Sequence, residues 1–247
     1  MRHGSGLLRG AVRNFWQPAL IVAASALSGC GGGSAETAGA RSAADEEEPR
    51  TRREGNKMAA SSEIGALDEG KVTQTFQGAM DELKRCLSAG ASRNEFEGGD
   101  IAFFVKIDTD GRAVHAHAER STLGDRETEK CMLKALRRQT WPRPQGGDVG
   151  LARNSVGFDM PNDTRPPTDW DSGRVRETIA SLGAKLDKCK HGASGEFTAT
   201  VYVDPDGATT SAGIASSDES GEEAADCLAG VLKDAKFPSP GSWTATG

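Results

Sequence analysis

Five cysteines are the residues of this chain best suited to covalent chemistry. In an oxidising compartment thiols pair as disulfides, and in a reducing one they more often bind metal or act as nucleophiles. An odd count leaves one cysteine without a thiol partner when the other four pair. A zinc site of four cysteines needs C-x-x-C spacing, whereas these cysteines stand far apart. The sequence therefore favours disulfides over a metal centre.

His115 and His117 are the second group that could do chemistry. Residues two apart in a strand point to the same face, so both imidazoles could bind one metal ion. No other ligand is positioned with them, and a second copy of the segment has Ser211 and Gly213 at the matching places. We therefore expect no metal and no cofactor. An envelope metal-binding protein or enzyme that uses these histidines is the alternative function.

The motif Asp-x-Asp-Gly occurs twice, at 108–111 and 204–207. An EF-hand calcium loop would need an acid two residues before the first Asp and a Glu at its twelfth position. In the first copy Lys106 and His117 occupy those places. Glycine tolerates positive φ, so Asp-Gly suits a tight hairpin turn, which is the better interpretation. The expected turn residues are Asp110, Gly111, Asp206 and Gly207.

Composition and motifs exclude several classes of function. Acidic residues outnumber basic ones by 36 to 30, and the formal net charge is −6, which argues against a nucleic-acid partner. The chain has no G-x-S-x-G nucleophile motif and no glycine loop placed to bind phosphate. We therefore expect a protein that is not an enzyme. A basic cluster is either a docking patch or the ordinary complement of a helix end: Lys134, Arg137, Arg138 and Arg143.

The first 29 residues have the pattern of a secretory signal peptide. A basic start carries Arg2, Arg9 and Arg13, and an apolar run at 19–27 ends in small residues. The run is shorter than the roughly 20 residues that a spanning helix needs.

The end of this segment, Leu27-Ser28-Gly29-Cys30, resembles the lipobox of bacterial lipoproteins. The resemblance implies that residues 1–29 are removed and that Cys30 receives the lipid. The alternative is ordinary secretion with a free thiol at Cys30. Lipidation would place the protein on the periplasmic side of the cell envelope, and Gly31 is compatible with the outer membrane.

Residues 30–70 are small, polar and charged, with almost no apolar periodicity. Such a segment cannot bury enough surface to offset the entropy of ordering it. We expect a disordered tether that holds the folded part away from the membrane. Its acidic run at 45–48 and the arginines at 50, 52 and 53 could form a docking patch, but a solvated linker is the better interpretation.

The rest of the chain repeats itself with an offset of 96 residues. Three landmarks share this offset: the Asp-x-Asp-Gly motifs, Cys131 with Cys227, and an aromatic-Pro-x-Pro motif at 141–144 and 237–240. Agreement of all three by chance is very improbable. The repeat predicts two tandem modules, at 71–160 and 174–247, joined by a Pro-rich linker at 161–173.

Each module shows the same order of patterns: helix, β-hairpin, helix and strand. A helical layer on a three-stranded antiparallel sheet gives an α+β fold. The expected helices are 76–87, 125–138, 175–186 and 222–235, and the expected strands are 103–107, 113–118, 149–158, 197–203, 209–214 and 242–246.

Each module carries one cysteine on, or shortly after, each of its two expected helices. Four cysteines allow three connectivities, and spacing alone leaves all of them open. The repeat favours pairing within each module, Cys86 with Cys131 and Cys189 with Cys227. Small domains often need such a covalent link because their cores are small.

The order Cys, hairpin, Cys-bearing helix, aromatic-Pro-x-Pro and final strand resembles the AgmX/PglI C-terminal domain, a relative of the TonB C-terminal domain. The matching pieces are "FFVKIDTDGRAVHAHAERSTLGDRETEKCMLKALRRQTWPRPQGGDVG" and, more loosely, "FTATVYVDPDGATTSAGIASSDESGEEAADCLAGVLKDAKFPSPG". The resemblance covers about 72–160 well and 174–247 partly, because the second copy lacks the Gly-Gly pair and ends soon after its last strand.

The resemblance implies a non-enzymatic envelope protein that binds other proteins, in a family associated with gliding or transport machinery. It implies binding by strand addition at a sheet edge, and it brings no catalytic residue. We expect partner contacts at the sheet edges and at the loop 88–100. A structural spacer without a specific partner is a third possibility.

Overall fold

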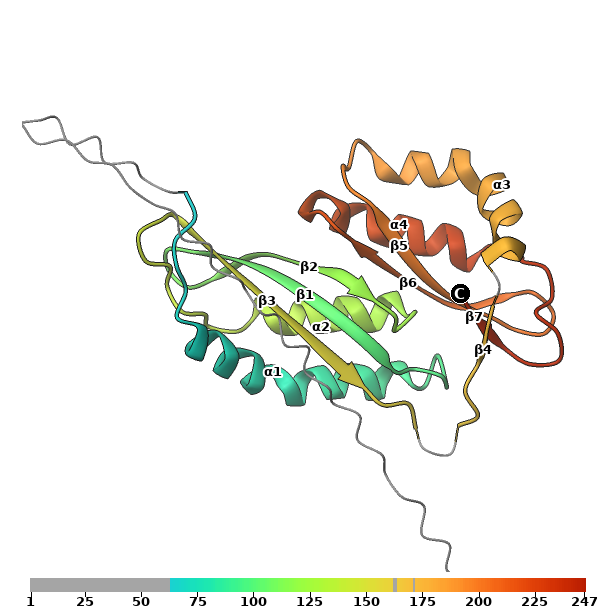
Figure 1. Ribbon diagram of the computed structural model, residues 1–247, viewed down its shortest axis with the longest axis horizontal. Coiled ribbons are helices and arrows are strands. Elements are labelled where there is room, and N and C mark those ends of the chain that lie inside the picture. Colours follow the sequence, from blue (N-terminus) through green and yellow to red (C-terminus); the bar gives the residue numbers. More distant parts are fainter. Residues whose placement is uncertain (1–62, 162–163, 171) are drawn as a thin grey trace, which may run out of the picture. The chain divides into compact units, whose positions relative to one another are not determined.

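The computed structural model describes residues 63–161, 164–170 and 172–247 (Figure 1). The predicted signal peptide, the predicted lipidation site Cys30 and most of the predicted tether lie outside the described residues. Within those residues, no helix has both the length and the apolar character needed to cross a membrane.

The described residues form four α-helices and two sheets, so the prediction of a mixed α+β fold is confirmed. The first module contains α1 (Glu69–Gly90), β1 (Gly99–Asp108), β2 (Ala113–Ser121), α2 (Arg126–Arg137) and β3 (Val149–Phe158). The second contains β4 (Thr168–Asp169), α3 (Ser172–Lys190), β5 (Phe197–Val203), β6 (Thr209–Ser216), a short 3-10 helix (Glu219–Gly221), α4 (Glu222–Lys233) and β7 (Ala245–Thr246).

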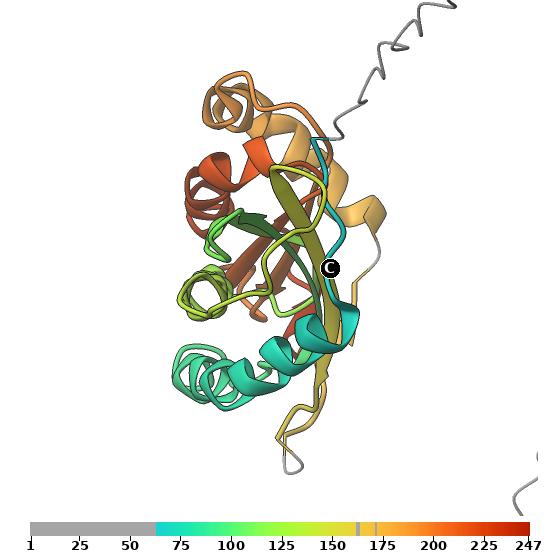
Figure 2. The same cartoon turned by 90° about the vertical axis from the view of Figure 1, so that its left-hand side faces the viewer.

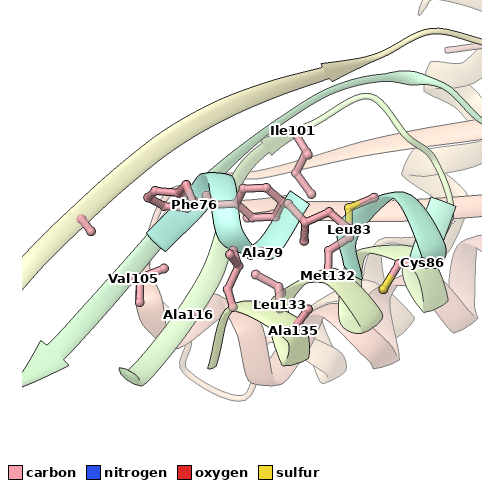
Figure 3. Close-up of a cluster of buried hydrophobic side chains, with 14 of the residues drawn as sticks. Phe76, Ala79, Leu83, Cys86, Ile101, Val105, Ala116, Met132, Leu133 and Ala135 are labelled. Atoms are coloured by element: carbon pink, nitrogen blue, oxygen red, sulfur yellow. The ribbon is translucent and has the colours of Figure 1, made fainter. Parts of the chain in front are cut away.

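The first module has an antiparallel sheet with strand order β2-β1-β3. Helices α1 and α2 pack on one side of this sheet (Figure 2). Alternation along β1 directs Ile101, Phe103 and Val105 into the core, where they are fully buried. The apolar residues of α1 recur every three or four positions and meet them from the opposite side, with Phe76 and Leu83 also buried (Figure 3). The core is therefore a two-layer helix-on-sheet core.

The two hairpins turn at the predicted places and in the same way. Asp108 Oδ1 accepts hydrogen bonds from the backbone N–H groups of Asp110 and Arg112, both at 2.9 Å. In the second module Asp204 Oδ1 does the same for Asp206 and Ala208. The first Asp of each motif thus holds the turn, a role that the known preference of Asp for binding its own backbone could have indicated.

A backbone hydrogen bond from the aromatic-Pro-x-Pro segment also holds each turn. The N–H of Trp141 donates to the carbonyl of Gly111 at 2.9 Å, and that of Phe237 donates to Gly207 at 2.8 Å. A Cβ on Gly111 would lie 2.4 Å from the Trp141 carbonyl oxygen, and the residue has a φ of +82°. Glycine is therefore required there for its conformation and for the close approach. The repeated aromatic-Pro motif serves to dock a hairpin.

Both predicted disulfides are present in the structure. Cys86–Cys131 links α1 to α2, and Cys189–Cys227 links α3 to α4. They close chain segments of 45 and 38 residues, and a loop of that length is worth about 4 kcal/mol in the chain-entropy model.

The structure corrects three predicted boundaries. The end of the predicted tether is ordered, because Gly65 donates to Val149 at 2.7 Å and α1 already begins at Glu69. The predicted linker contains β4, which pairs in parallel with β7, and the first residues of α3. The strand expected at 242–246 is reduced to Ala245–Thr246. Short strands without alternation leave no periodic signal in a sequence.

Arg126 is the main polar contact between the two modules. Its guanidinium donates to Glu222 and to Asp226, both at 2.7 Å, and its side chain is only 7% exposed. Lys130 forms a second ion pair with Asp226 at 3.0 Å. Arg126 and Glu222 stand 96 residues apart, as do Lys130 and Asp226, so equivalent positions of α2 and α4 meet each other.

The strands β2 and β6 complete this contact between the modules. Glu129, which is fully buried, accepts a hydrogen bond from the backbone N–H of Ile214 on β6 at 3.0 Å. The Ser211 hydroxyl donates to the Gly124 carbonyl at 2.6 Å. Side chains of each module therefore satisfy backbone groups of the other.

We expect Arg126→Leu to lower the free energy of unfolding by about 3–5 kcal/mol, because the largely buried Glu222 loses its cation at 2.7 Å and keeps only Arg137 at 4.0 Å. Arg112→Leu is the matched control, since it removes only an exposed ion pair with Asp110 and should cost less than about 1 kcal/mol. Urea unfolding of both variants measures the difference. Equal small losses would show that Arg126 does not hold the modules together.

Candidate interaction surfaces

The histidines that could bind a metal lie together, as their spacing predicts. His115 Nε2 and His117 Nδ1 are 3.1 Å apart and share a hydrogen bond. His117 is 2% exposed and packs against the ring of Phe104. Burial lowers the pKa of His117 to about 4 and also lowers that of His115, so both are neutral at pH 7. Among residues 63–161, 164–170 and 172–247 no group of three or more His, Cys, Asp or Glu side chains could hold a metal ion.

Two side chains of the basic cluster at the end of α2 form hydrogen bonds within the protein. Arg137 donates to the carbonyl of Ala116 at 2.6 Å, and Arg138 donates to Glu82 at 3.0 Å. These side chains line one wall of a cleft of about 810 Å³, and acidic residues of α4 such as Glu223 line the other. The cleft therefore presents both signs of charge, which does not select a strongly anionic ligand.

Part of the loop 88–100, where we expected partner contacts, packs inside the protein, while residues such as Ser92, Arg93 and Glu95 are exposed. Its Phe96 is 4% exposed and stacks on Tyr202 with ring centroids 5.9 Å apart. Trp243 meets the same ring edge-on at 6.0 Å, and the Tyr202 hydroxyl donates to the Phe96 carbonyl. The aromatic residue of this loop therefore anchors the second module.

Two buried carboxyl groups lie near this contact and were not identified from the sequence. Glu97 is 1% exposed, and neither of its carboxyl oxygens has a hydrogen-bond partner among the described residues. Desolvation raises the pKa of Glu97 to about 7 and that of Glu129 also to about 7. Single acidic residues in a polar loop or on a helix give no sequence signal of burial.

The sheet edges differ in how far they are covered. The edges formed by β2 and β6 lie against the opposite module. The outer edge of β3 pairs only at its beginning, where Val149 exchanges hydrogen bonds with Glu63 and Gly65. Backbone groups alternate sides along a strand, so Leu151, Arg153, Ser155 and Gly157 direct theirs outward.

The outer edge of β3 carries features that hinder random pairing. The side chain of Asn154 accepts a hydrogen bond from the Ser155 N–H at 2.9 Å. Arg153 lies 4.6 Å above the Phe104 ring and forms an ion pair with Glu119 at 2.9 Å. Charged and self-bonded edges resist aggregation while staying open to a specific strand.

No family model, no curated protein and no solved structure matches this chain. The AgmX/PglI-like and TonB-like character of the modules therefore remains a prediction from their motifs.

We expect Glu129→Gln to change how stability depends on pH. The pKa of Glu129 rises from 4.5 to about 7 on folding, so its favourable contribution is complete below about pH 4.5 and is lost as pH rises to about 7. Gln imitates the protonated acid and does not titrate. The free energy of unfolding of the variant, relative to that of the wild type, should therefore rise by roughly 3 kcal/mol between pH 4.5 and 8.

Denaturant unfolding at several pH values measures this difference. His117 has the opposite pH dependence but is present in both proteins, so it cancels in the comparison. Glu95→Gln, at an exposed residue, controls for the loss of one acidic side chain. A pH-independent difference between Glu129→Gln and the wild type would show that Glu129 is not buried as described.

Proposed function

We propose that this chain is a lipid-anchored envelope protein whose two TonB-like modules bind partner proteins and catalyse no reaction. Its anchor would be Cys30, on the periplasmic side and in the outer membrane. Two disulfides are compatible with the oxidising compartment that this location provides. The motif resemblance favours partners in gliding or transport machinery of the envelope.

The observation that carries the proposal is the outward edge of β3. Strand β3 is ten residues long, and beyond Val149 no described strand pairs with its outer side. A free edge of this length can bind an extended segment through backbone hydrogen bonds, with side chains of alternate residues giving specificity. TonB-like domains are expected to bind partners in this way.

The alternative function, metal binding or catalysis at His115 and His117, has less support. The two rings bond to each other, and no third ligand stands with them among the described residues. Metal analysis of the purified protein tests it directly. Stoichiometric zinc or copper that is lost in His115→Ala would favour that function over ours.

A photo-crosslinking amino acid at Ser155, on the exposed edge of β3, tests the proposed binding in intact envelopes. We expect a reproducible crosslinked product of defined mass, because a bound strand would lie about 5 Å from β3. The same amino acid at Ser88, an exposed position on α1, is the matched control and should give no such product.

Two results would contradict the proposal. The absence of any product at Ser155 would favour a spacer without a specific partner. Equal products at Ser155 and Ser88 would indicate nonspecific crowding at the membrane instead of strand addition.

A further inference from the structure

The second sheet is incomplete when it is compared with the first. Strand β3 pairs with β1 over ten residues, from Gly99 to Asp108. In the second module β7 pairs with β5 over only two residues, Tyr202 and Val203, and Gly247 adds hydrogen bonds to Val201. Among the described residues nothing pairs with β5 on this side of Phe197–Thr200.

The backbone groups at this edge point to the uncovered side. Val201 exchanges both of its hydrogen bonds with Gly247, at 2.9 and 3.2 Å, whereas the Glu196 carbonyl accepts from Ser217 on the β6 side. Sides alternate along an antiparallel strand, so Phe197 and Ala199 direct their N–H and C=O groups away from β6. Two donors and two acceptors are thus arranged to receive another strand.

The hydrophobic core is less covered at the same place. Ile101 and Phe103 of β1, where β3 is paired alongside, are completely buried, but their equivalents at an offset of 96, Phe197 and Ala199, are only partly buried. Val201, which lies beside Gly247, is buried again. The change in burial therefore follows the end of the paired strand.

The helix beneath this edge shows the same difference. In α1 the core-facing Phe76 and Leu83 are at most 2% exposed. Their counterparts in α3, counted from the disulfide cysteine, are Ile179 and Leu186, and both are only partly buried. A strand beside β5 would cover apolar area on both β5 and α3, and buried apolar area favours association.

A cleft of about 650 Å³ adjoins this edge. Thr200 and Tyr202 of β5 line it together with Gly247 and Trp170. The indole Nε1 of Trp170 is buried and has no hydrogen-bond partner among the described residues. Open space therefore adjoins β5 at Thr200, which is the end of the uncovered segment nearest to Gly247.

We propose that the edge of β5 at Phe197–Thr200 is an acceptor site for one extended segment of a partner protein, which completes the second sheet antiparallel to β5. The first module indicates the chemistry of that segment, because β3 fills the same place beside β1. There Val156 lies opposite Ile101 and Asn154 opposite Phe103, and Val156 and Phe158 pack on the core. The partner segment would be about six residues long, with β-branched or aromatic side chains at alternate positions.

This inference deepens the proposed binding function and rests on it, because that function supplies the natural partner. The probe is a capped peptide with the sequence of residues 153–158, Arg-Asn-Ser-Val-Gly-Phe. Amide hydrogen exchange of the full protein, read by NMR, should be fast at Phe197 and Ala199 and slow at Ile101 and Phe103. Saturating peptide should slow exchange at Phe197 and Ala199 by at least about tenfold.

Two matched peptides test the backbone pairing. N-methylation at the residue copied from Val156 removes an N–H that would face β5, and it should abolish protection. N-methylation at the residue copied from Ser155 removes an N–H on the outer side, and it should leave protection intact.

A chain variant gives an independent test. When residues 153–158 are copied after Gly247, the extension can fill the site in cis at a high effective concentration. Phe197 and Ala199 should then be protected without peptide, and added peptide should have no further effect.

Three results would overturn the inference. Slow exchange at Phe197 and Ala199 in the free monomer would mean that the edge is already covered. Failure of both the peptide and the extension to protect these amides would exclude a strand site. Protection that appears only as the protein dimerises would assign the site to a second copy. These outcomes concern β5 alone, whereas crosslinking at Ser155 tests partner binding at β3.

Discussion

The buried guanidinium of Arg126 determines which surfaces of this protein remain available. A cation removed from water is costly unless anions surround it, and here Glu222 and Asp226 of the second module do so. This pairing places α2 beside α4 and β2 against β6. The sheet edges formed by β2 and β6 are therefore covered within the protein. The outer edge of β3 and part of the edge of β5 are left for binding.

The two modules share one plan but use equivalent positions differently. Each docks its hairpin with an aromatic-Pro segment and links its helices by a disulfide, which supports a small core. At the contact the symmetry is broken: Glu129 caps the backbone of β6, while its equivalent, Ala225, is a buried core residue. The features that both repeats share therefore specify the fold. Positions that differ between the repeats, such as Glu129 and Ala225, help to form the contact between the modules.

The sequence repeat predicted the helices, both hairpins and the disulfide pairing, because those features depend on local periodicity and on matched spacing. It did not predict that Arg126 meets Glu222, because a single charged pair 96 residues apart gives no periodic signal. The burial of Phe96 was missed for a similar reason, since a lone aromatic in a polar loop gives no periodic signal of burial. Two-residue strands such as β4 are too short to be recognised from alternation.

The most direct test of the account compares amide hydrogen exchange of the protein in native envelopes with that of the purified protein, by mass spectrometry. The account predicts slower exchange in envelopes for residues 149–158 and 195–203, which contain β3 and β5, and unchanged exchange for the buried β1. Identical exchange at both edges in the two preparations would contradict the claim that this protein works by binding partner strands.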